Sequence, residues 1–242
     1  MCGILRLKQM QVEERFSFLQ YIYGGCHMHL MIGIDFTLSN GDPKSPSSLH
    51  FFDPNRNEYL QAIHSVGDIL QCYDTDRNIA VYGFGAQVPP VAGRASHCFA
   101  LNGNVFNPKL QGVPNIVDCY RNALNNVKLY GPTHFSEIIA KAVDQASHEQ
   151  ISQFNQHYYT LLILTDGIIN DMDATIDQIV RGSSLPLSII IVGVGGEDFS
   201  SMEVLDADDK PLYSTKLQKQ MERDIVQFVP FREFKDDPYR LA

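Results

Sequence analysis

Acidic and hydroxyl side chains occur at three places in the chain where a predicted strand ends or a predicted helix begins. Asp35, Thr37 and Ser39 alternate directly after one apolar run. Asp166 follows a second apolar run, and Thr133 precedes a segment with helical spacing. Carboxylates and hydroxyls, with no thiolate or imidazole required, form a hard ligand set that suits Mg²⁺ or Mn²⁺ better than Zn²⁺. We therefore predict that Asp35, Thr37, Ser39, Thr133 and Asp166 are metal ligands.

The number of carboxylates in this set also indicates how the ion would be used. Two aspartates neutralise a divalent cation, whereas a cage with more carboxylates would quench its Lewis acidity and fill its coordination sphere. We expect one position to remain for water or for an acidic group of a partner. Each motif alone has an ordinary structural role, as an Asx turn, a helix N-cap or a tight turn. Their joint occurrence, in order and at element ends, favours the metal site.

Strands and helices alternate along the chain in a way that would bring these residues to one edge. Buried strands of a parallel sheet are predicted at 28–34, 78–84, 159–165 and 187–194. Helical apolar stripes lie within 59–70, 116–127, 135–146 and 176–180, and a last helix is predicted at 214–228. This order predicts an α/β fold with a doubly wound, mostly parallel central sheet flanked by helices. Ligands of such sheets bind beyond the carboxyl ends of the strands, where the five predicted ligands lie.

The remaining segments have patterns of their own. Residues 86–113 are rich in Pro and Gly and predict a long connection, with room for a short hairpin. The acidic stretches 171–173 and 206–209 are interpreted as solvated helix starts, which would repel acidic lipid headgroups.

Length and charge exclude several classes of function. The 242 residues are enough for one large domain or one domain with an appendage. With 19 Lys and Arg against 28 Asp and Glu, the net charge of −9 argues against a nucleic-acid binder. Five widely spaced cysteines without a CxxC pair, and no signal-like start, fit a reducing cytosolic setting.

The metal motif and several longer strings resemble known families. Asp35-x-Thr37-x-Ser39, then Thr133, then Asp166, resembles the metal-ion-dependent adhesion site of von Willebrand factor A domains, with Thr37 in place of a usual Ser. The wider sequence, over roughly residues 16–235, is similar to the copine family. The strings that carry this likeness are IGIDFTLSNGDPKSPSSLHFFDP, YGFGA, YGPTHFSEII, LLILTDGIINDMDATIDQIV, SIIIVGVGGEDFSSMEVLDADD and VQFVPFREF.

This resemblance implies a role for each ligand and an organisation for the chain. Thr37 and Ser39 would bind the metal from the first loop and Thr133 from the second, while Asp35 and Asp166 would bind directly or through water. The domains implied are 1–24 as the end of a preceding module and a linker, 25–235 as an A domain, and 236–242 as a tail. Copines carry two calcium-dependent phospholipid-binding modules before the A domain, so the resemblance implies a cytoplasmic protein with calcium-dependent peripheral membrane association.

Two main functions remain as expectations. The first is a non-enzymatic interaction domain, without catalytic residues, in which Mg²⁺ or Mn²⁺, with Ca²⁺ as the alternative ion, recruits intracellular proteins through an acidic side chain. Phospholipid membranes would be bound only through the two calcium-dependent modules that the resemblance implies, which are not part of this sequence. The second is a metal-assisted phosphoryl-transfer or hydrolytic enzyme, for which the chain lacks a phosphate loop and an identifiable acid or base. A third, simpler expectation is a domain that only positions its neighbours.

Overall fold

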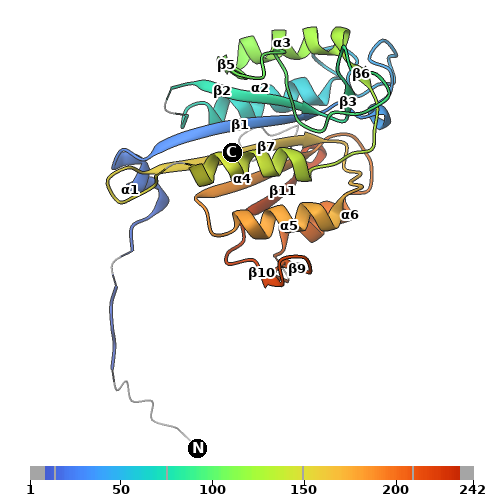
Figure 1. The fold of residues 1–242 in the computed structure, drawn as a ribbon. Helices are drawn as coiled ribbons and strands as arrows, with labels where there is room; N and C mark the ends of the chain where they lie inside the picture. The colour runs from blue at the N-terminus through green and yellow to red at the C-terminus, as the bar shows by residue number, and fades with distance from the viewer. Residues whose placement is uncertain (1–8, 14, 75, 149, 209, 235–242) are drawn as a thin grey trace, which may run out of the picture.

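A seven-stranded sheet crosses the middle of the molecule, with helices on both of its faces (Figure 1). The structure is a computed structural model that describes residues 9–13, 15–74, 76–148, 150–208 and 210–234. The strand order is β11-β8-β7-β1-β2-β4, with β5 also paired to β2. Strands β11, β8, β7, β1 and β2 run parallel, and the two short strands against β2 are antiparallel. The predicted doubly wound, mostly parallel sheet is therefore confirmed.

The strands of this sheet follow the apolar runs closely. Their bounds are β1 (His27–Asp35), β2 (Asn78–Phe84), β4 (Phe99–Ala100), β5 (Lys109–Gln111), β7 (His157–Thr165), β8 (Leu187–Gly193) and β11 (Val226–Pro230). Two small two-stranded sheets pair β3 (Ala86–Gln87) with β6 (Lys128–Leu129) and β9 (Tyr213–Ser214) with β10 (Lys219–Gln220).

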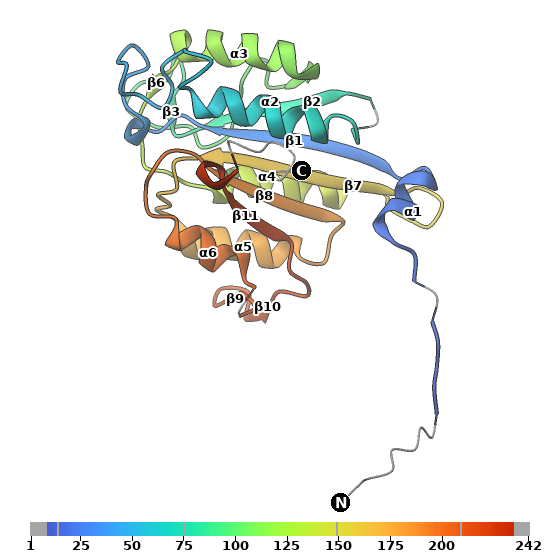
Figure 2. The same cartoon turned by 180° about the vertical axis from the view of Figure 1, so that it is seen from behind.

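Helices α2 and α3 cover one face of the sheet and α4, α5 and α6 cover the other, as the two opposite views show (Figure 2). Each contributes an apolar stripe to one of two buried clusters, which the sheet separates. The helices are α1 (Phe18–Tyr23), α2 (Glu58–Leu70), α3 (Gly112–Asn126), α4 (Ser136–His148), α5 (Met172–Gly182) and α6 (Ser200–Asp206), with 3₁₀ turns η1 (Leu38–Asn40) and η2 (Phe231–Glu233). None of the helices in the described ranges is both long and apolar enough to span a bilayer.

The predicted helix over 214–228 is wrong. This segment forms β9 and β10 and then β11, which pairs in parallel with β8. Val226 and Phe228 are buried and the residue between them is exposed, which is the period of a strand. The apolar residues of 214–228 also recur every three or four positions, and this spacing led to the prediction of a helix. Pairing with the free edge of β8 satisfies the backbone of β11, and Pro230, which has no N–H to donate, is compatible with an edge strand.

The predicted long connection is present between β2 and α3. It contains β3, and β4 and β5 pair with β2 instead of forming a hairpin with each other. Residues 1–8 and 235–242, which include the predicted tail 236–242, lie outside the described residues. The predicted domain boundaries therefore stay a prediction.

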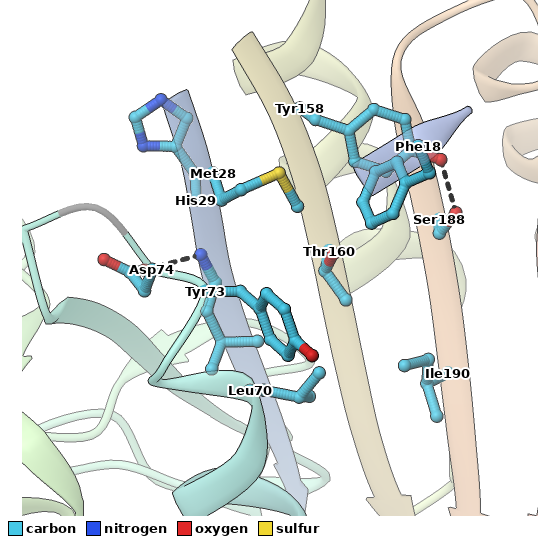
Figure 3. A pocket seen from close by; sticks show the side chains of 11 residues that line it. Phe18, Met28, His29, Leu70, Tyr73, Asp74, Tyr158, Thr160, Ser188 and Ile190 are labelled. Carbon is cyan, nitrogen blue, oxygen red and sulfur yellow. Dashed lines mark hydrogen bonds between the residues drawn. The ribbon is translucent and has the colours of Figure 1, made fainter. Parts of the chain in front are cut away.

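An apolar pocket of about 450 Å³ lies at the amino ends of β1, β7 and β8 (Figure 3). Met28, Phe18 and Tyr158 line it from three different elements. Three of its polar side chains form hydrogen bonds: the Tyr158 and Ser188 hydroxyls lie 2.6 Å apart, and Asp74 accepts a bond from the Leu30 N–H. The pocket lies at the opposite end of these strands from the five predicted ligands.

Candidate metal centre

Asp35 is the last residue of β1, and its side chain is fully buried at the carboxyl edge of the sheet. One carboxylate oxygen, Oδ1, accepts bonds from the Thr37 N–H at 2.8 Å and the Thr37 hydroxyl at 2.6 Å. The other, Oδ2, accepts a bond from the Thr165 hydroxyl at 2.7 Å. The side chain is therefore held by hydroxyls from both neighbouring segments, one of which follows β1 and one of which ends β7.

Thr37 contacts Asp35, and the backbone after Thr37 then brings Ser39 beside Thr37. Thr37 pairs with Tyr130 in an isolated parallel bridge, and a 3₁₀ turn then begins at Leu38. The turn places the Ser39 hydroxyl 3.0 Å from the Thr37 hydroxyl. Thr37 is buried, whereas Ser39 is exposed at the rim. The first loop thus presents a buried carboxylate, a buried hydroxyl and an exposed hydroxyl in sequence.

Asp166 follows β7 and is as deeply buried as Asp35. Neither of its carboxylate oxygens has a hydrogen-bond partner in the part of the chain that the structure describes. Burial raises the pKa of Asp166, and the nearby Ser39 hydroxyl opposes this rise without lying in hydrogen-bonding geometry. Burial and the charge of Asp166 together raise the pKa of Asp35 from 3.8 to about 7. Two buried carboxylates therefore lie close enough to disfavour each other's charged form.

Thr133 lies on a loop that is fastened to both other loops of the site. The Leu38 N–H donates to the Tyr130 carbonyl at 2.6 Å. On the other side, Thr133 exchanges two bonds with Asn170, each of 2.9 Å. Thr133 is buried, and it does not cap the helix that follows it. These ties hold the second loop against the first and third.

The cap of α4 comes instead from Asp171, whose role sequence reasoning missed. Its carboxylate accepts bonds from the Phe135 and Ser136 N–H groups at 2.9 and 3.0 Å. Residues 171–173 do start helix α5 as predicted, but the Asp171 carboxylate binds the start of α4 instead of only solvent. A carboxylate at a helix N-terminus satisfies free N–H groups and complements the helix dipole. Asn170 and Asp171 together fix the Thr133 loop to the loop that carries Asp166.

Two glycines allow the loops to approach this closely. Gly85 has φ +81°, and a Cβ there would lie 2.2 Å from the Thr37 Cγ2. Gly167 has φ +99°, and a Cβ there would lie 2.3 Å from the Phe199 ring. Both positions have a positive φ that residues other than glycine rarely adopt, and neither has space for a Cβ atom. Gly85 and Gly167 are therefore needed for the loops of the site to pack together.

A second buried network behind Asp35 was also missed by sequence reasoning. Asn40 donates to the Thr37 carbonyl at 3.2 Å, and its own oxygen accepts a bond from the Tyr59 hydroxyl at 2.7 Å. His50 stacks on Tyr59, with 4.5 Å between ring centroids, and its Nδ1 lies 2.6 Å from the Tyr120 hydroxyl. Polar residues this far apart in sequence carry no spacing signal, so only the fold reveals that they support the first loop.

The side chains present fit a divalent cation. The two buried oxygens of Asp166 accept no hydrogen bond of normal geometry from the described residues, and an unpaired buried carboxylate is costly unless it binds a cation or a proton. The neighbouring Asp35 carboxylate and the hydroxyls of Thr37, Ser39 and Thr133 supply further hard oxygen atoms, which Mg²⁺ and Mn²⁺ prefer.

A separate acidic group, Asp206, Asp208 and Asp224, lies at the end of α6, with one oxygen of each residue within 4.8 Å of the others. Asp206 already accepts bonds from the Phe228 N–H at 3.1 Å and from Gln227 at 3.2 Å. The interpretation of this stretch as a solvated helix start is therefore wrong for Asp206, which anchors β11 to the end of α6.

Comparison with known proteins places this fold and this sequence. The manganese-loaded TRAP protein of Plasmodium vivax superposes with a TM-score of 0.52 at 12% identity, over 87% of this chain and 71% of that one. Proximal thread matrix protein 1 from the mussel byssus, solved with a zinc-occupied MIDAS motif, gives 0.42 at 16% identity, over 90% and 46%. The first likeness supports the von Willebrand factor A-like fold. The family model Copine matches residues 48–241, which is most of the chain. The chain therefore belongs to the copine family.

Proposed function

We propose that this domain is a divalent-metal-dependent protein-interaction module. Asp35, Thr37, Ser39, Thr133 and Asp166 would hold Mg²⁺ or Mn²⁺, with Ca²⁺ as the alternative ion. The observation that carries the proposal is Asp166, because its two buried carboxylate oxygens accept no hydrogen bond within the described ranges and lie beside a second buried carboxylate. A cation of charge +2 would balance both carboxylates and remove their mutual repulsion.

The bound ion would supply an electrophilic point for an acidic side chain of a partner. The two aspartates only neutralise the ion, and the three hydroxyls are neutral donors, so the ion keeps its attraction for a further carboxylate. The exposure of Ser39 and Leu38 supports the proposal, because a side chain of a partner can reach these residues from solvent. The buried residues of this chain hold the ion in place, and the exposed rim admits the partner.

In the full-length protein, we propose that the module recruits intracellular partner proteins to membranes during signalling or trafficking. Membrane contact would come from calcium-dependent phospholipid-binding modules, and the protein would be cytoplasmic with peripheral membrane association. The net charge of −9 supports this division, because an acidic domain is repelled by anionic lipid.

The phosphoryl-transfer alternative needs a group that moves a proton near the ion. His50, which lies behind Asp35, is fully buried, and burial lowers its pKa to about 3. An imidazole with this pKa is a weak base at neutral pH. His50 therefore supports the structure of the first loop and does not favour the enzymatic alternative.

Calorimetric titration with Mg²⁺ and Mn²⁺ tests the metal proposal. Asp166→Asn keeps the shape of the side chain and removes its charge, so affinity should fall about a hundredfold or more, beyond the effect of losing an outer-shell contact. Asp173→Asn, an exposed aspartate seven residues along the chain, is the matched control and should bind as the wild type does. Equal affinity in wild type and Asp166→Asn would contradict the proposal.

Capture of partners tests the interaction proposal. Proteins retained by the immobilised domain in Mg²⁺ should be lost in EDTA and from Asp166→Asn, and retained by Asp173→Asn. Retention that is indifferent to metal would show that the ion, if bound, serves only the fold. Turnover of ATP or an aryl phosphate by wild type, but not by folded Asp166→Asn, would instead support the enzymatic alternative.

A further inference from the structure

A groove of about 520 Å³ begins beside the candidate metal centre. Leu38, the residue between the proposed ligands Thr37 and Ser39, lines the groove and is 64% exposed. The other walls come from the segment after η1, from Phe52, and from the end of α3 with β6. A molecule bound in this groove would therefore contact Leu38, which adjoins two of the proposed metal ligands in sequence.

The groove is basic in a chain that is acidic overall. Lys44, Arg121 and Lys128 line it, and Asp42 is the single acid among its lining residues. None of these three cations has a carboxylate within ion-pairing distance in the described part of the chain. The chain as a whole is acidic, with 28 acids and 19 Lys and Arg residues. The groove, with three cations and one acid, is instead locally positive. Such a focus attracts anionic ligands.

Stacking holds the Arg121 side chain, and hydrogen bonds hold the backbone of Lys44 and Lys128. The Arg121 guanidinium lies over the Phe52 ring at 4.1 Å from its centroid. The Lys44 N–H donates to the Asp42 carboxylate at 3.0 Å, which closes the turn that carries Lys44. Lys128 is on β6, which pairs with β3. Binding would therefore cost little ordering of the backbone.

Apolar side chains lie between the cations and indicate the kind of anion. Leu38 is largely exposed, and Phe52 and Leu124 are half-buried along the groove. A lipid headgroup or a free phosphate would leave these side chains unused, whereas a peptide can place apolar side chains against them and acidic ones against the cations. The net charge of −9 also disfavours an anionic membrane as the ligand.

We propose that this groove binds an acidic segment of a partner protein, in which acidic and apolar side chains alternate. The proposal rests on the proposed function in one respect: one carboxylate of the same segment would reach the metal ion. The metal would supply a single strong contact, and the groove would select segments with further acidic residues beside it.

The test uses a labelled peptide of alternating Glu and Leu, with fluorescence anisotropy in Mg²⁺. In the variant Lys44→Glu with Lys128→Glu, affinity should fall roughly tenfold or more, mainly through a slower association rate. The matched control is Lys210→Glu with Lys216→Glu, two exposed lysines near β9 and β10 that give the same change in net charge. The control should lose less than about twofold, because exposed charges far apart are screened by salt. Equal weakening in both variants, or none in the groove variant, would overturn the proposal.

A metal arm separates this proposal from the proposed function. In EDTA, or with Asp166→Asn, the peptide should bind more weakly. The remaining affinity should be sensitive to salt and should be lost in the groove variant. Loss of all binding without metal, together with wild-type binding by the groove variant, would overturn the groove and leave the metal module standing. Binding that ignores metal but depends on the groove would support the groove and contradict the metal module. Binding of phosphatidylserine vesicles that needs Lys44 and Lys128, with no binding of the peptide, would overturn the proposal in favour of a membrane.

Discussion

Buried aspartates at the two ends of the sheet have opposite surroundings. At the carboxyl end, the two oxygens of Asp166 have no donor in the described part of the chain. At the amino end, Asp74 accepts bonds from the backbone N–H groups of Leu30, Asp76 and Arg77, at 2.8, 3.2 and 2.9 Å. Burial raises the pKa of both. The donors therefore decide what a buried carboxylate does: Asp74 joins a loop to β1, and Asp166 stays available to a cation at a cost in stability.

The side chains around these aspartates differ in the same way. The pocket beside Asp74 is lined largely by apolar side chains such as Met28 and Phe18, and the Tyr158 and Ser188 hydroxyls that it contains lie 2.6 Å apart (Figure 3). At the other end, the Thr37 and Thr165 hydroxyls donate to Asp35 itself, and the Ser39 hydroxyl lies 3.0 Å from that of Thr37. The two ends of one sheet therefore separate stability from ligand binding, and substitutions at each end should separate them too.

The largest effect should come from Asp74→Ala. Three backbone N–H groups would lose their acceptor, so the free energy of unfolding should fall by about 2–4 kcal/mol, while Mg²⁺ affinity stays at the wild-type value. Urea denaturation and metal titration of the same sample measure both. Asp76→Ala, at an exposed neighbour, should cost less than about 1 kcal/mol. A loss of metal affinity in folded Asp74→Ala would show that the two ends are coupled.

Asp166→Asn should do the reverse. Removing one of two adjacent buried charges relieves repulsion, so the metal-free domain should gain about 1–2 kcal/mol at a pH of about 8. Addition of Mg²⁺ should then give no further stabilisation. Thermal unfolding in EDTA and in Mg²⁺ measures both effects. A less stable metal-free variant would mean that Asp166 contributes to folding in a way that its missing partners do not indicate.

The pH dependence of metal stabilisation should sharpen this contrast. Without metal, the pKa of Asp35 in the folded chain is about 7, against an ordinary 3.8, so the folded state holds a proton that the unfolded state releases between these values. The metal-free domain should therefore lose stability as the pH rises through this window. A metal ion must displace that proton at low pH, so stabilisation by Mg²⁺ should be larger at a pH of about 8 than at about 5.5, by roughly 1 kcal/mol or more.

The comparison of Mg²⁺ with EDTA at each pH provides the control. Burial keeps His50 neutral, so His50 makes the domain less stable as the pH falls, which is the opposite direction. This contribution is the same in Mg²⁺ and in EDTA, and it cancels when the two free energies are subtracted. Equal stabilisation by Mg²⁺ at both pH values would contradict a role for the Asp35 carboxylate.

The sequence predicted the strands and the three loops of the site because their signals are local. An apolar run that stops at Asp35 or Thr165 reports burial on both faces of a sheet, and parallel strands bring their carboxyl ends to one edge. The helix over 214–228 failed because the free edge of β8 pairs with Val226–Pro230, a contact between segments far apart that spacing within one segment cannot reveal.

The supporting residues of the site were not predictable for the same reason. Thr165, Asn40 and Asp171 act through partners in other loops, and each has an ordinary local interpretation. The basic groove is a further case, since Lys44, Arg121 and Lys128 are scattered along the chain and only the fold brings them together. Residues that contact the ion need a particular chemistry and leave a motif, whereas residues that orient them need only a position in space.

The same isosteric change can be made at two threonines of β7, Thr165 at its carboxyl end and Thr160 nearer its amino end. The Thr165 hydroxyl donates to Asp35 at 2.7 Å and accepts a bond from the Gly167 N–H at 3.2 Å, so Thr165→Val should weaken Mg²⁺ binding about tenfold by releasing Asp35 from its fixed orientation. Thr160→Val removes the same hydroxyl in the apolar pocket, and should leave Mg²⁺ affinity unchanged and stability within about 0.5 kcal/mol. Calorimetric titration of the two variants side by side makes the comparison. Similar affinities would mean that the Thr165 hydroxyl contributes no more to metal binding than the Thr160 hydroxyl does, and that Asp35 is oriented by Thr37 alone.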